Sequence, residues 1–300
     1  MYVIIGASGN TGSVVANKLL SQGKKVRVVG RNAGHLTLFT AKGAEPLIGN
    51  VTDKSMIARA FTGAKAAYVM LPPDPGARDF FTYTDEVTET LASAVEKSGV
   101  KHVVSLSSVG AEKPNNTGPI VGLHRLEERL NRISGLNTLH LRAAYFMENT
   151  LGQADAIAQM GSVASPLRPE LKFPIIATRD IGAFAADALS RLDFTGHQVQ
   201  DLLGQRDLSY GEITAIIGKA IGKPDLNYAT LTQEQFRGAL TQMGMSENFA
   251  ELLSEMTEAM DSGYIKPLEQ RSSRNTTPTS YETFVADTFL PGYQRKRPAA

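Results

Sequence analysis

The 300-residue chain contains no cysteine, and its positive and negative charges nearly cancel. The absence of cysteine excludes a disulfide framework, thiolate catalysis, iron–sulfur clusters and cysteine-ligated zinc. The 31 basic and 30 acidic residues leave a formal net charge of +1, so no overall field attracts nucleic acid or an anionic membrane surface. We therefore expect a small-molecule partner.

Long hydrophobic runs are also missing. No apolar stretch approaches the roughly 18 residues that a transmembrane helix needs, and the first six residues lack the basic and apolar regions of a signal peptide. These absences predict a cytoplasmic protein that does not enter a membrane. Whether it is a monomer or a homodimer stays open.

Short β-branched runs alternate with helical patterns over the first half of the chain. Strands are predicted at residues 2–5, 26–29, 46–48, 67–71, 103–106 and 138–141. Helical periodicity between them, as at 14–21 and 84–97, predicts a parallel sheet covered by helices on both faces. The first strand is apolar on both sides, which is typical of a central strand in a doubly wound sheet.

The pattern loosens after about residue 150. Helices are predicted at 180–191, 213–221, 232–242 and 247–261, with weak strand candidates at 199–203 and 226–229. Ser209 and Glu212 have the spacing of a capping box. The polar tail, residues 272–300, is predicted as a surface segment with a frayed basic end.

The first strand runs directly into a glycine-rich turn, Gly6-Ala7-Ser8-Gly9-Asn10-Thr11-Gly12, followed by a helix. Such glycines permit a tight turn, a close approach of the backbone to a pyrophosphate, and close packing of helix on strand. The helix N-terminus then offers free N–H groups to the phosphates. Gly12 is followed by Ser13, not by the Lys of a P-loop. The turn therefore predicts a dinucleotide site, with candidate contacts at Gly6, Ser8, Gly9, Asn10, Thr11 and Gly12.

The second strand ends in Gly30-Arg31-Asn32, where an NAD-selective site usually carries Asp or Glu. Arg31 suits a ribose 2′-phosphate, and no acid occurs between Lys24 and Gly43. The predicted cofactor is therefore NADP(H). The alternative is that Arg31 is simply a solvated loop cation.

An ordered set of motifs resembles the NmrA-like family of atypical short-chain dehydrogenases/reductases. It comprises the glycine turn and residues 28–31, 49–53, 107–111 and 141–149. The resemblance covers residues 1 to about 230 and implies a seven-stranded Rossmann sheet with a small substrate lobe. We accordingly assign 1–150 to a dinucleotide-binding Rossmann domain. Residues 151–300 are assigned to a smaller, mostly helical C-terminal substrate lobe, interleaved with the last sheet strands.

The same resemblance assigns roles to residues outside the turn. It implies Asn50 and Val51 beside the adenine, Leu71 and Pro72 along the nicotinamide ribose, and Tyr145, Phe146 and Asn149 at the substrate pocket. Leu71 and Tyr145 are equally compatible with core positions.

The catalytic pair of typical short-chain dehydrogenases is missing. That pair is a Tyr with a Lys four residues later, and no tyrosine here has Lys at that offset. Two candidates remain: His124, near where relatives place Lys or His, as a proton donor, and Ser107, with Ser108, as a hydrogen-bonding hydroxyl. A surface or capping histidine and ordinary strand-end serines are the alternatives. The other histidines show no metal-ligand spacing, so no metal is predicted.

Two functions remain open. Family members include NADPH-dependent quinone, dye and phenylpropanoid reductases, and also regulators that bind dinucleotide without known turnover. The first hypothesis is an NADPH-dependent reductase of a readily reduced acceptor such as a quinone, dye, activated enone or imine, which takes hydride without a strong acid. The second is a dinucleotide-sensing regulator. DNA binding is the weakest candidate, since basic residues cluster only at 295–297.

Overall fold

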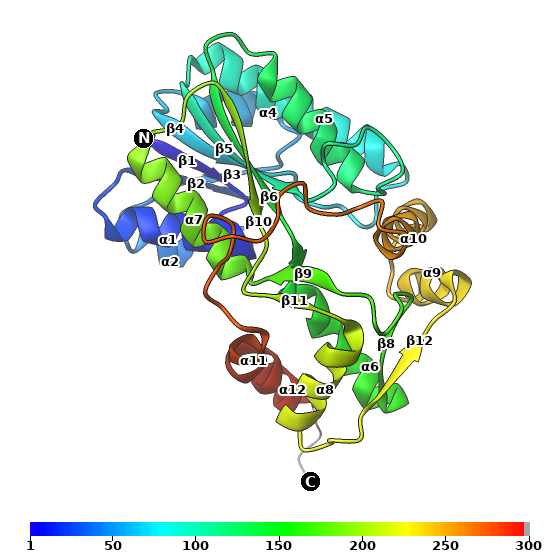
Figure 1. Ribbon diagram of the computed structural model, residues 1–300. Helices are drawn as coiled ribbons and strands as arrows, with labels where there is room; N and C mark the ends of the chain where they lie inside the picture. The colour runs from blue at the N-terminus through cyan, green and yellow to red at the C-terminus, as the bar shows by residue number, and fades with distance from the viewer. Residues whose placement is uncertain (297–300) are drawn as a thin grey trace.

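A seven-stranded parallel sheet forms the larger part of the molecule, and a smaller lobe lies below it in Figure 1. The structure is a computed structural model and describes residues 1–296. The strands are β1 (Tyr2–Ile5), β2 (Val26–Gly30), β3 (Glu45–Ile48), β4 (Ala66–Val69), β5 (His102–Ser108), β6 (Asn137–Ala143) and β10 (His197–Leu202). Their spatial order is β10-β6-β5-β4-β1-β2-β3, and each neighbouring pair is parallel. The connections change direction between β1 and β4, where a doubly wound sheet opens its ligand crevice.

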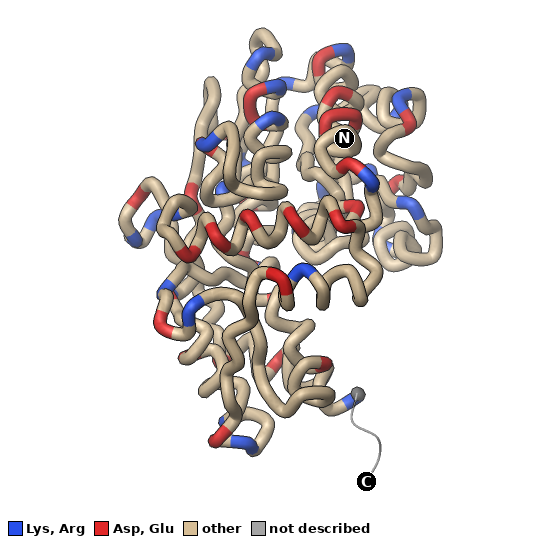
Figure 2. Tube along the Cα trace, turned by 90° about the vertical axis from the view of Figure 1, so that its right-hand side faces the viewer, with Lys and Arg blue, Asp and Glu red and all other residues tan. Residues whose placement is uncertain are grey.

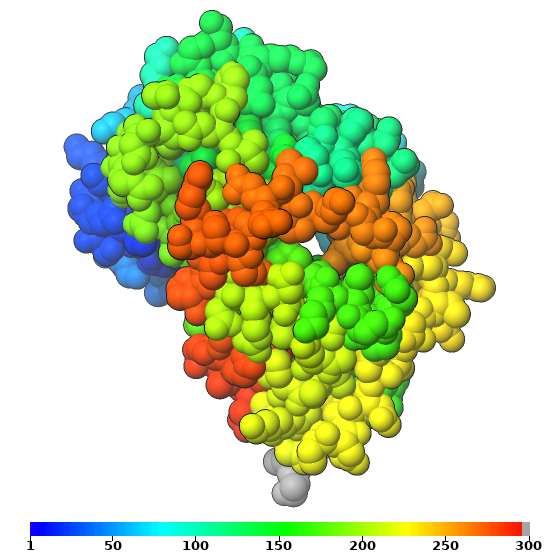
Figure 3. Space-filling model, in the orientation of Figure 1, coloured from blue at the N-terminus to red at the C-terminus, as the bar shows by residue number. Residues whose placement is uncertain are grey.

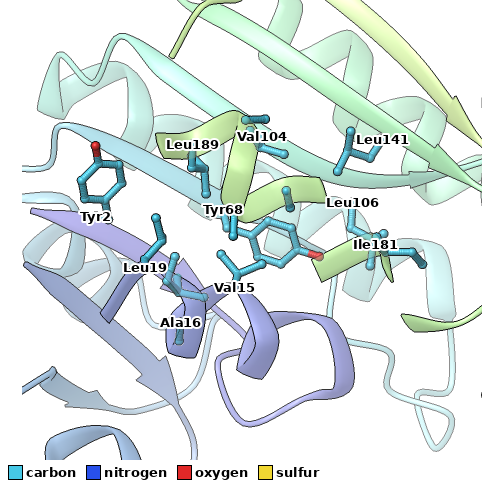
Figure 4. Close-up of a cluster of buried hydrophobic side chains, with 14 of the residues drawn as sticks. Tyr2, Val15, Ala16, Leu19, Tyr68, Val104, Leu106, Leu141, Ile181 and Leu189 are labelled. Atoms are coloured by element: carbon cyan, nitrogen blue, oxygen red, sulfur yellow. The ribbon is translucent and has the colours of Figure 1, made fainter. Parts of the chain in front are cut away.

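The side chains of the central strands alternate between two apolar cores, one on each face of the sheet. Tyr2 and Ile4 of β1 pack with α1 (Asn10–Ser21) and α7 (Thr178–Arg191), in the cluster partly drawn in Figure 4. Val3 and Ile5 pack on the opposite face, which is covered by α3 (Lys54–Phe61), α4 (Phe80–Ser98) and α5 (Ile120–Asn131). Helices on both faces confirm the doubly wound α/β fold predicted from the sequence.

Helices α1 and α7 are in close contact although about 160 residues separate them. A Cβ on Gly182 would lie 2.6 Å from the Val14 Cβ and 2.7 Å from the Thr11 carbonyl oxygen, so the contact needs glycine. An ion pair of 2.7 Å joins Lys18 to Asp187 across the same interface. The second half of the chain thus supplies both α7 and β10 to the sheet region.

The smaller lobe combines short strands with helices around its own apolar core. It contains β7 (Tyr145–Phe146), η2 (Met147–Gly152), α6 (Gln153–Met160), β8 (Ser162–Ser165), β9 (Phe173–Ile176), β11 (Asp207–Leu208), α8 (Tyr210–Ala220), β12 (Asn227–Thr230), α9 (Gln233–Gln242), α10 (Glu247–Asp261), α11 (Tyr281–Phe284), the π-helical η3 (Val285–Phe289) and α12 (Leu290–Lys296). The predicted capping box at Ser209 and Glu212 is present, and a second one begins α9 at Thr232. Two short elements, η1 (Ala33–Leu36) and α2 (Thr37–Thr40), follow β2.

Residues 262–275, called the strap below, cross back from α10 over the edge of the main sheet (orange in Figure 1). The backbone N–H groups of Leu268 and Glu269 donate to the Asp201 carboxylate of β10, at 3.2 and 3.3 Å. Arg271 forms an ion pair with Asp207 and donates to the Leu203 carbonyl at 3.1 Å. These contacts hold the strap against both the sheet and the lobe.

The tail is not the surface segment that the sequence predicted. Tyr281, Phe284, Val285, Phe289 and Tyr293 are buried in the core of the lobe, on consecutive helical turns. Their spacing is that of one apolar helix face, which the surrounding polar residues obscured. Arg295 is exposed, as expected of a basic end, and Arg297 lies outside the described residues.

His140 of β6 is fully buried within a polar network inside the sheet region. Its Nδ1 lies 2.6 Å from the Ser105 hydroxyl and its Nε2 lies 2.8 Å from Asn131 Oδ1. Because an amide oxygen only accepts, Nε2 donates to Asn131, and in the neutral ring Nδ1 then accepts from Ser105. Burial lowers the pKa of His140 to about 4.

This lowered pKa predicts a loss of stability in mild acid. The unfolded chain binds a proton at His140 near pH 6.5, whereas the folded protein does not until about pH 4. The free energy of unfolding should therefore fall as the pH drops from about 6.5 to 4, by up to about 3 kcal/mol. Urea unfolding across this range measures the slope. His140→Gln should flatten it and the exposed His35→Gln should not; an unchanged slope in His140→Gln would contradict the assignment.

Candidate functional site

The glycine-rich turn leads from β1 into the N-terminus of α1. Gly6 adopts a φ of +68°, and its carbonyl accepts the Gly9 N–H at 2.9 Å, which closes the turn. Gly9 is the N-cap of α1 and supplies no side-chain cap. The first-turn N–H groups of α1 are therefore left for a ligand, and the helix dipole places partial positive charge there.

Close packing inside the turn explains two of its glycines. A Cβ on Gly12 would lie 2.3 Å from the Gly6 carbonyl oxygen, so no side chain fits at this position. A Cβ on Gly9 would lie 3.2 Å from the same oxygen, which is tight but not prohibitive. The buried Thr11 hydroxyl accepts from the Tyr68 hydroxyl at 2.9 Å and ties the turn to β4. The turn is thus rigid and presents backbone, as a pyrophosphate site requires.

The residues predicted to surround the adenosine end lie at the neighbouring strand ends. Arg31 directly follows β2, is exposed, and forms no ion pair or hydrogen bond with any residue in 1–296. Asn50 and Val51 follow β3; Asn50 is exposed and Val51 is buried. Within the described chain, the Arg31 guanidinium is therefore available to a phosphate.

A cavity of about 510 Å³ opens at the carboxyl ends of β4, β5 and β6. Its walls are mainly apolar. The sheet side contributes Met70, Leu71, Leu106 and Ser107. Met70 also connects the cavity to the glycine turn, because its sulfur lies 2.8 Å from where a Gly6 Cβ would be. The glycine-rich turn and the cavity thus both contact Met70.

The predicted substrate residues Tyr145, Phe146 and Asn149 all line this cavity. The Tyr145 hydroxyl lies 3.0 Å from the Tyr210 hydroxyl, and its ring packs edge-on against Phe173 with centroids 5.3 Å apart. Burial raises the pKa of Tyr145 above its usual value, which keeps it neutral. Leu71 lines the cavity as well, whereas Pro72 is not among the lining residues and its carbonyl accepts from Tyr83 at 2.9 Å.

Ser107 lines the cavity and is held from behind by a buried ion pair. Its hydroxyl donates to Glu127 Oε1 at 2.5 Å, and Arg142 donates to both oxygens of that carboxylate at 3.0 and 2.6 Å. Burial lowers the pKa of Arg142, but the hydrogen bond and charge of Glu127 outweigh that effect and raise it. Because its proton is given to Glu127, the Ser107 hydroxyl could serve a ligand only as an acceptor. The Ser108 hydroxyl donates to the Val109 carbonyl at 3.0 Å.

His124 stands one residue after a cavity residue, Leu123, but is itself not among the lining residues. Its Nδ1 lies 2.9 Å from the Ala111 carbonyl oxygen, so Nδ1 donates and Nε2 carries the lone pair in the neutral ring. In this arrangement His124 can deliver a proton from Nε2 only as the imidazolium. Its role as a proton donor stays a hypothesis.

The outer wall of the cavity comes from segments that the sequence did not mark. The apolar face of α10 contributes Phe249, Leu253, Met256 and Met260, and the strap contributes Ile265 and its neighbours. Phe249 also packs on Phe80 of α4, with ring centroids 4.9 Å apart. The spacing of the apolar residues in α10 predicted a helix with one apolar face. It did not predict which part of the protein this face would pack against.

The sequence matches a family of known proteins. A family model described as the NmrA-like family matches residues 2–286. The chain belongs to the NmrA-like family. This confirms the resemblance drawn from the ordered motifs.

Several characterised proteins are similar over most of this NmrA-like chain. It is 28% identical over 260 residues to an NAD(P)H azoreductase of Xenophilus azovorans, covering 85% of this chain and 86% of the relative. It is 24% identical over 260 residues to quinone oxidoreductase 2 of Escherichia coli, covering 85% and 86%. The crystal structure of the E. coli NADPH-dependent quinone oxidoreductase with NADPH superposes with a TM-score of 0.81 at 22% identity, over 96% of this chain and 100% of that one. That likeness confirms the fold.

Figure 2 shows positively and negatively charged residues interspersed over the face that carries α9 and α10, with acidic residues recurring along α10. Within residues 1–296 no helix is long and apolar enough to span a bilayer, and no group of three or more His, Asp or Glu is placed to hold a metal.

Proposed function

We propose that this NmrA-like protein is an NADPH-dependent reductase that transfers hydride to a readily reduced small acceptor, such as a quinone, a dye, or an activated enone or imine. The observation that carries the proposal is the continuity of the site. A rigid turn with free helix N–H groups lies next to an apolar cavity of about 510 Å³, and Met70 contacts both. Cavities of this size and polarity hold drug-sized molecules.

The residues present fit the cofactor. Gly12 and Gly9 leave the turn without side chains where a pyrophosphate would lie against α1, and Arg31 stands unpaired at the end of β2. When bound, NADPH supplies the hydride. The chain itself would orient both reactants, and the apolar walls would exclude water from between them.

The polar groups of the cavity explain the expected choice of acceptor. The hydroxyl protons of Ser107 and Ser108 are both donated within the protein, and burial raises the pKa of Tyr145, which makes its phenol a weaker acid. None of these three hydroxyls is therefore arranged like the acidic Tyr of typical short-chain dehydrogenases. Acceptors that take hydride first and exchange protons with water later suit such a site.

A spectrophotometric assay of NADPH oxidation against quinones, azo dyes and enals tests the proposal. Turnover with at least one quinone or dye is expected, exceeding that with simple ketones. NADPH binding without turnover on any acceptor would instead favour the regulatory role, in which the cavity senses dinucleotide occupancy.

The cofactor preference gives a separate prediction. Arg31→Ala should weaken NADPH binding by about 10- to 100-fold, because a charge-assisted hydrogen bond to the 2′-phosphate is lost. NADH binding to the same variant should change little, since NADH has no such phosphate. Calorimetry with both dinucleotides provides the comparison. Equal losses for the two would show that Arg31 supports the site in some other way.

A further inference from the structure

Three charged residues line the mainly apolar cavity, and all three belong to the lobe or the strap. Lys172 precedes β9, Asp207 lies in β11 beside β9, and Lys266 lies in the strap. Figure 3 shows an opening between the orange strap and the green and yellow lobe. These charges flank the cavity on the side away from the main sheet.

In the described part of the chain, two of these three charged residues form ion pairs, and the third does not. Asp207 is bound by Arg271, and Lys172 lies 3.0 Å from Glu212. Lys266 has neither a hydrogen bond nor an ion pair to any residue in 1–296, and its side chain is exposed. The carboxylates of Asp207 and Glu212 are therefore each paired with a cation. The ammonium group of Lys266 has no such partner among residues 1–296.

Lys172 can also bind a ligand with only a small loss of interaction free energy. Its ion pair with Glu212 is exposed on both sides, and such pairs contribute only about 0–1 kcal/mol. Glu212 is held independently, because its other oxygen accepts the Ser209 N–H at 2.8 Å in the capping box of α8. Removing Lys172 from Glu212 would thus leave the carboxylate in place.

The distance from Lys172 to Tyr145 along the cavity wall matches a flat molecule. Tyr145 pairs with Ile175 in the register of β7 and β9, and Lys172 precedes Ile175 by three residues, or about 10 Å of extended chain. Between them the wall is aromatic, with Phe173 against Tyr145. A two-ring aromatic body with one polar end spans this length.

We propose that the acceptor is a planar, apolar molecule that carries an anionic substituent, and that Lys266 and Lys172 bind this anion at the cavity opening. The ring system lies against the aromatic wall, and the sulfonate, carboxylate or phosphate remains close to water. This rests on the proposed reductase function and narrows its substrate class. Because the anion keeps its contacts throughout the reaction, the lysines should lower KM and leave kcat unchanged.

A matched pair of unreactive probes tests the charge directly. Naphthalene-2-sulfonate and its neutral sulfonamide have the same body, and calorimetry measures their binding to the protein loaded with NADP⁺. The sulfonate should bind about 5- to 10-fold more tightly at low salt, and the advantage should shrink at high salt. Lys266→Met and Lys172→Met should each reduce it, and Lys97→Met, a remote exposed lysine on α4, should not.

The outcomes separate this inference from the reductase function. Equal affinity for the two probes, or an advantage that survives in both Lys266→Met and Lys172→Met, would overturn the anion site. With reducible acceptors, a carboxylated azo dye should show a lower KM than its methyl ester in the parent protein but not in Lys266→Met. Reduction of both dyes with equal KM would refute the anion site and leave the reductase function standing. Selective sulfonate binding without any NADPH oxidation would support the anion site and refute the reductase function.

Discussion

Replacing Gly9 with valine is expected to weaken NADPH binding by about 100-fold or more, equivalent to ~2.7 kcal/mol, while the protein stays folded. Gly9 has a φ of −83° and a ψ of 176°, a conformation that valine adopts readily. Its added methyl groups would occupy the approach to the first-turn N–H groups of α1. The binding loss therefore comes from blocked access and not from unfolding.

Calorimetric titration with NADPH, together with the thermal midpoint of each variant, measures this effect. Gly238→Val is a suitable control, since a Cβ there meets no atom within 4 Å and α9 is remote from the turn. Gly12→Ala should behave differently, because its Cβ would collide with the Gly6 carbonyl and lower stability as well. Full NADPH affinity in a folded Gly9→Val protein would refute the phosphate-binding assignment.

Glu127→Ala is expected to destabilise the protein by about 3–5 kcal/mol, because it leaves the Arg142 guanidinium buried without its main partner. Arg142 is 8% exposed; of the other acids near it, Glu112 lies 3.6 Å away without a hydrogen bond, and Asp201 acts on it through charge without a hydrogen bond. The Ser107 hydroxyl loses its acceptor at the same time. Both losses occur at or directly behind the cavity residue Ser107.

The neighbouring residue supplies a matched control. Glu128 lies on the same helix in an exposed pair with Arg132 at 3.5 Å, so Glu128→Ala should cost less than about 1 kcal/mol. Urea unfolding of both variants gives the comparison. A double variant, Glu127→Leu with Arg142→Met, should recover much of the stability, because it removes both charges together. A loss as small for Glu127→Ala as for Glu128→Ala would show that water already solvates Arg142.

The sequence predicted the sheet and the glycine turn well, because both depend on short-range signals. β1, the turn and α1 occupy the first 21 residues, and the β-branched runs mark the strands to within one or two residues at each end. Arg31 could likewise be placed at the end of β2 by counting along one βαβ unit.

The outer wall of the cavity could not be predicted in this way. Phe249 meets Phe80 across about 170 residues, and the strap that carries Lys266 is held by contacts with Asp201 and Asp207. No periodicity within α10 or the strap encodes those distant contacts. The Ser107–Glu127–Arg142 arrangement was missed for the same reason, since it joins β5, α5 and β6. The tail is a different case, because the spacing of Tyr281, Phe284 and Phe289 was a local signal.

The return of α7 and β10 to the sheet has a consequence for biosynthesis. Ribosomes release the chain from its N-terminus, so β6 remains an open edge until β10 has emerged at Leu202. Until then one face of the nascent sheet also lacks Ile181, Ala185 and Leu189 of α7. A growing chain of 150 to 190 residues therefore presents both an unpaired strand and bare apolar surface, the two features that promote aggregation. Chaperone demand during translation should peak in that interval and end once the seventh strand has paired.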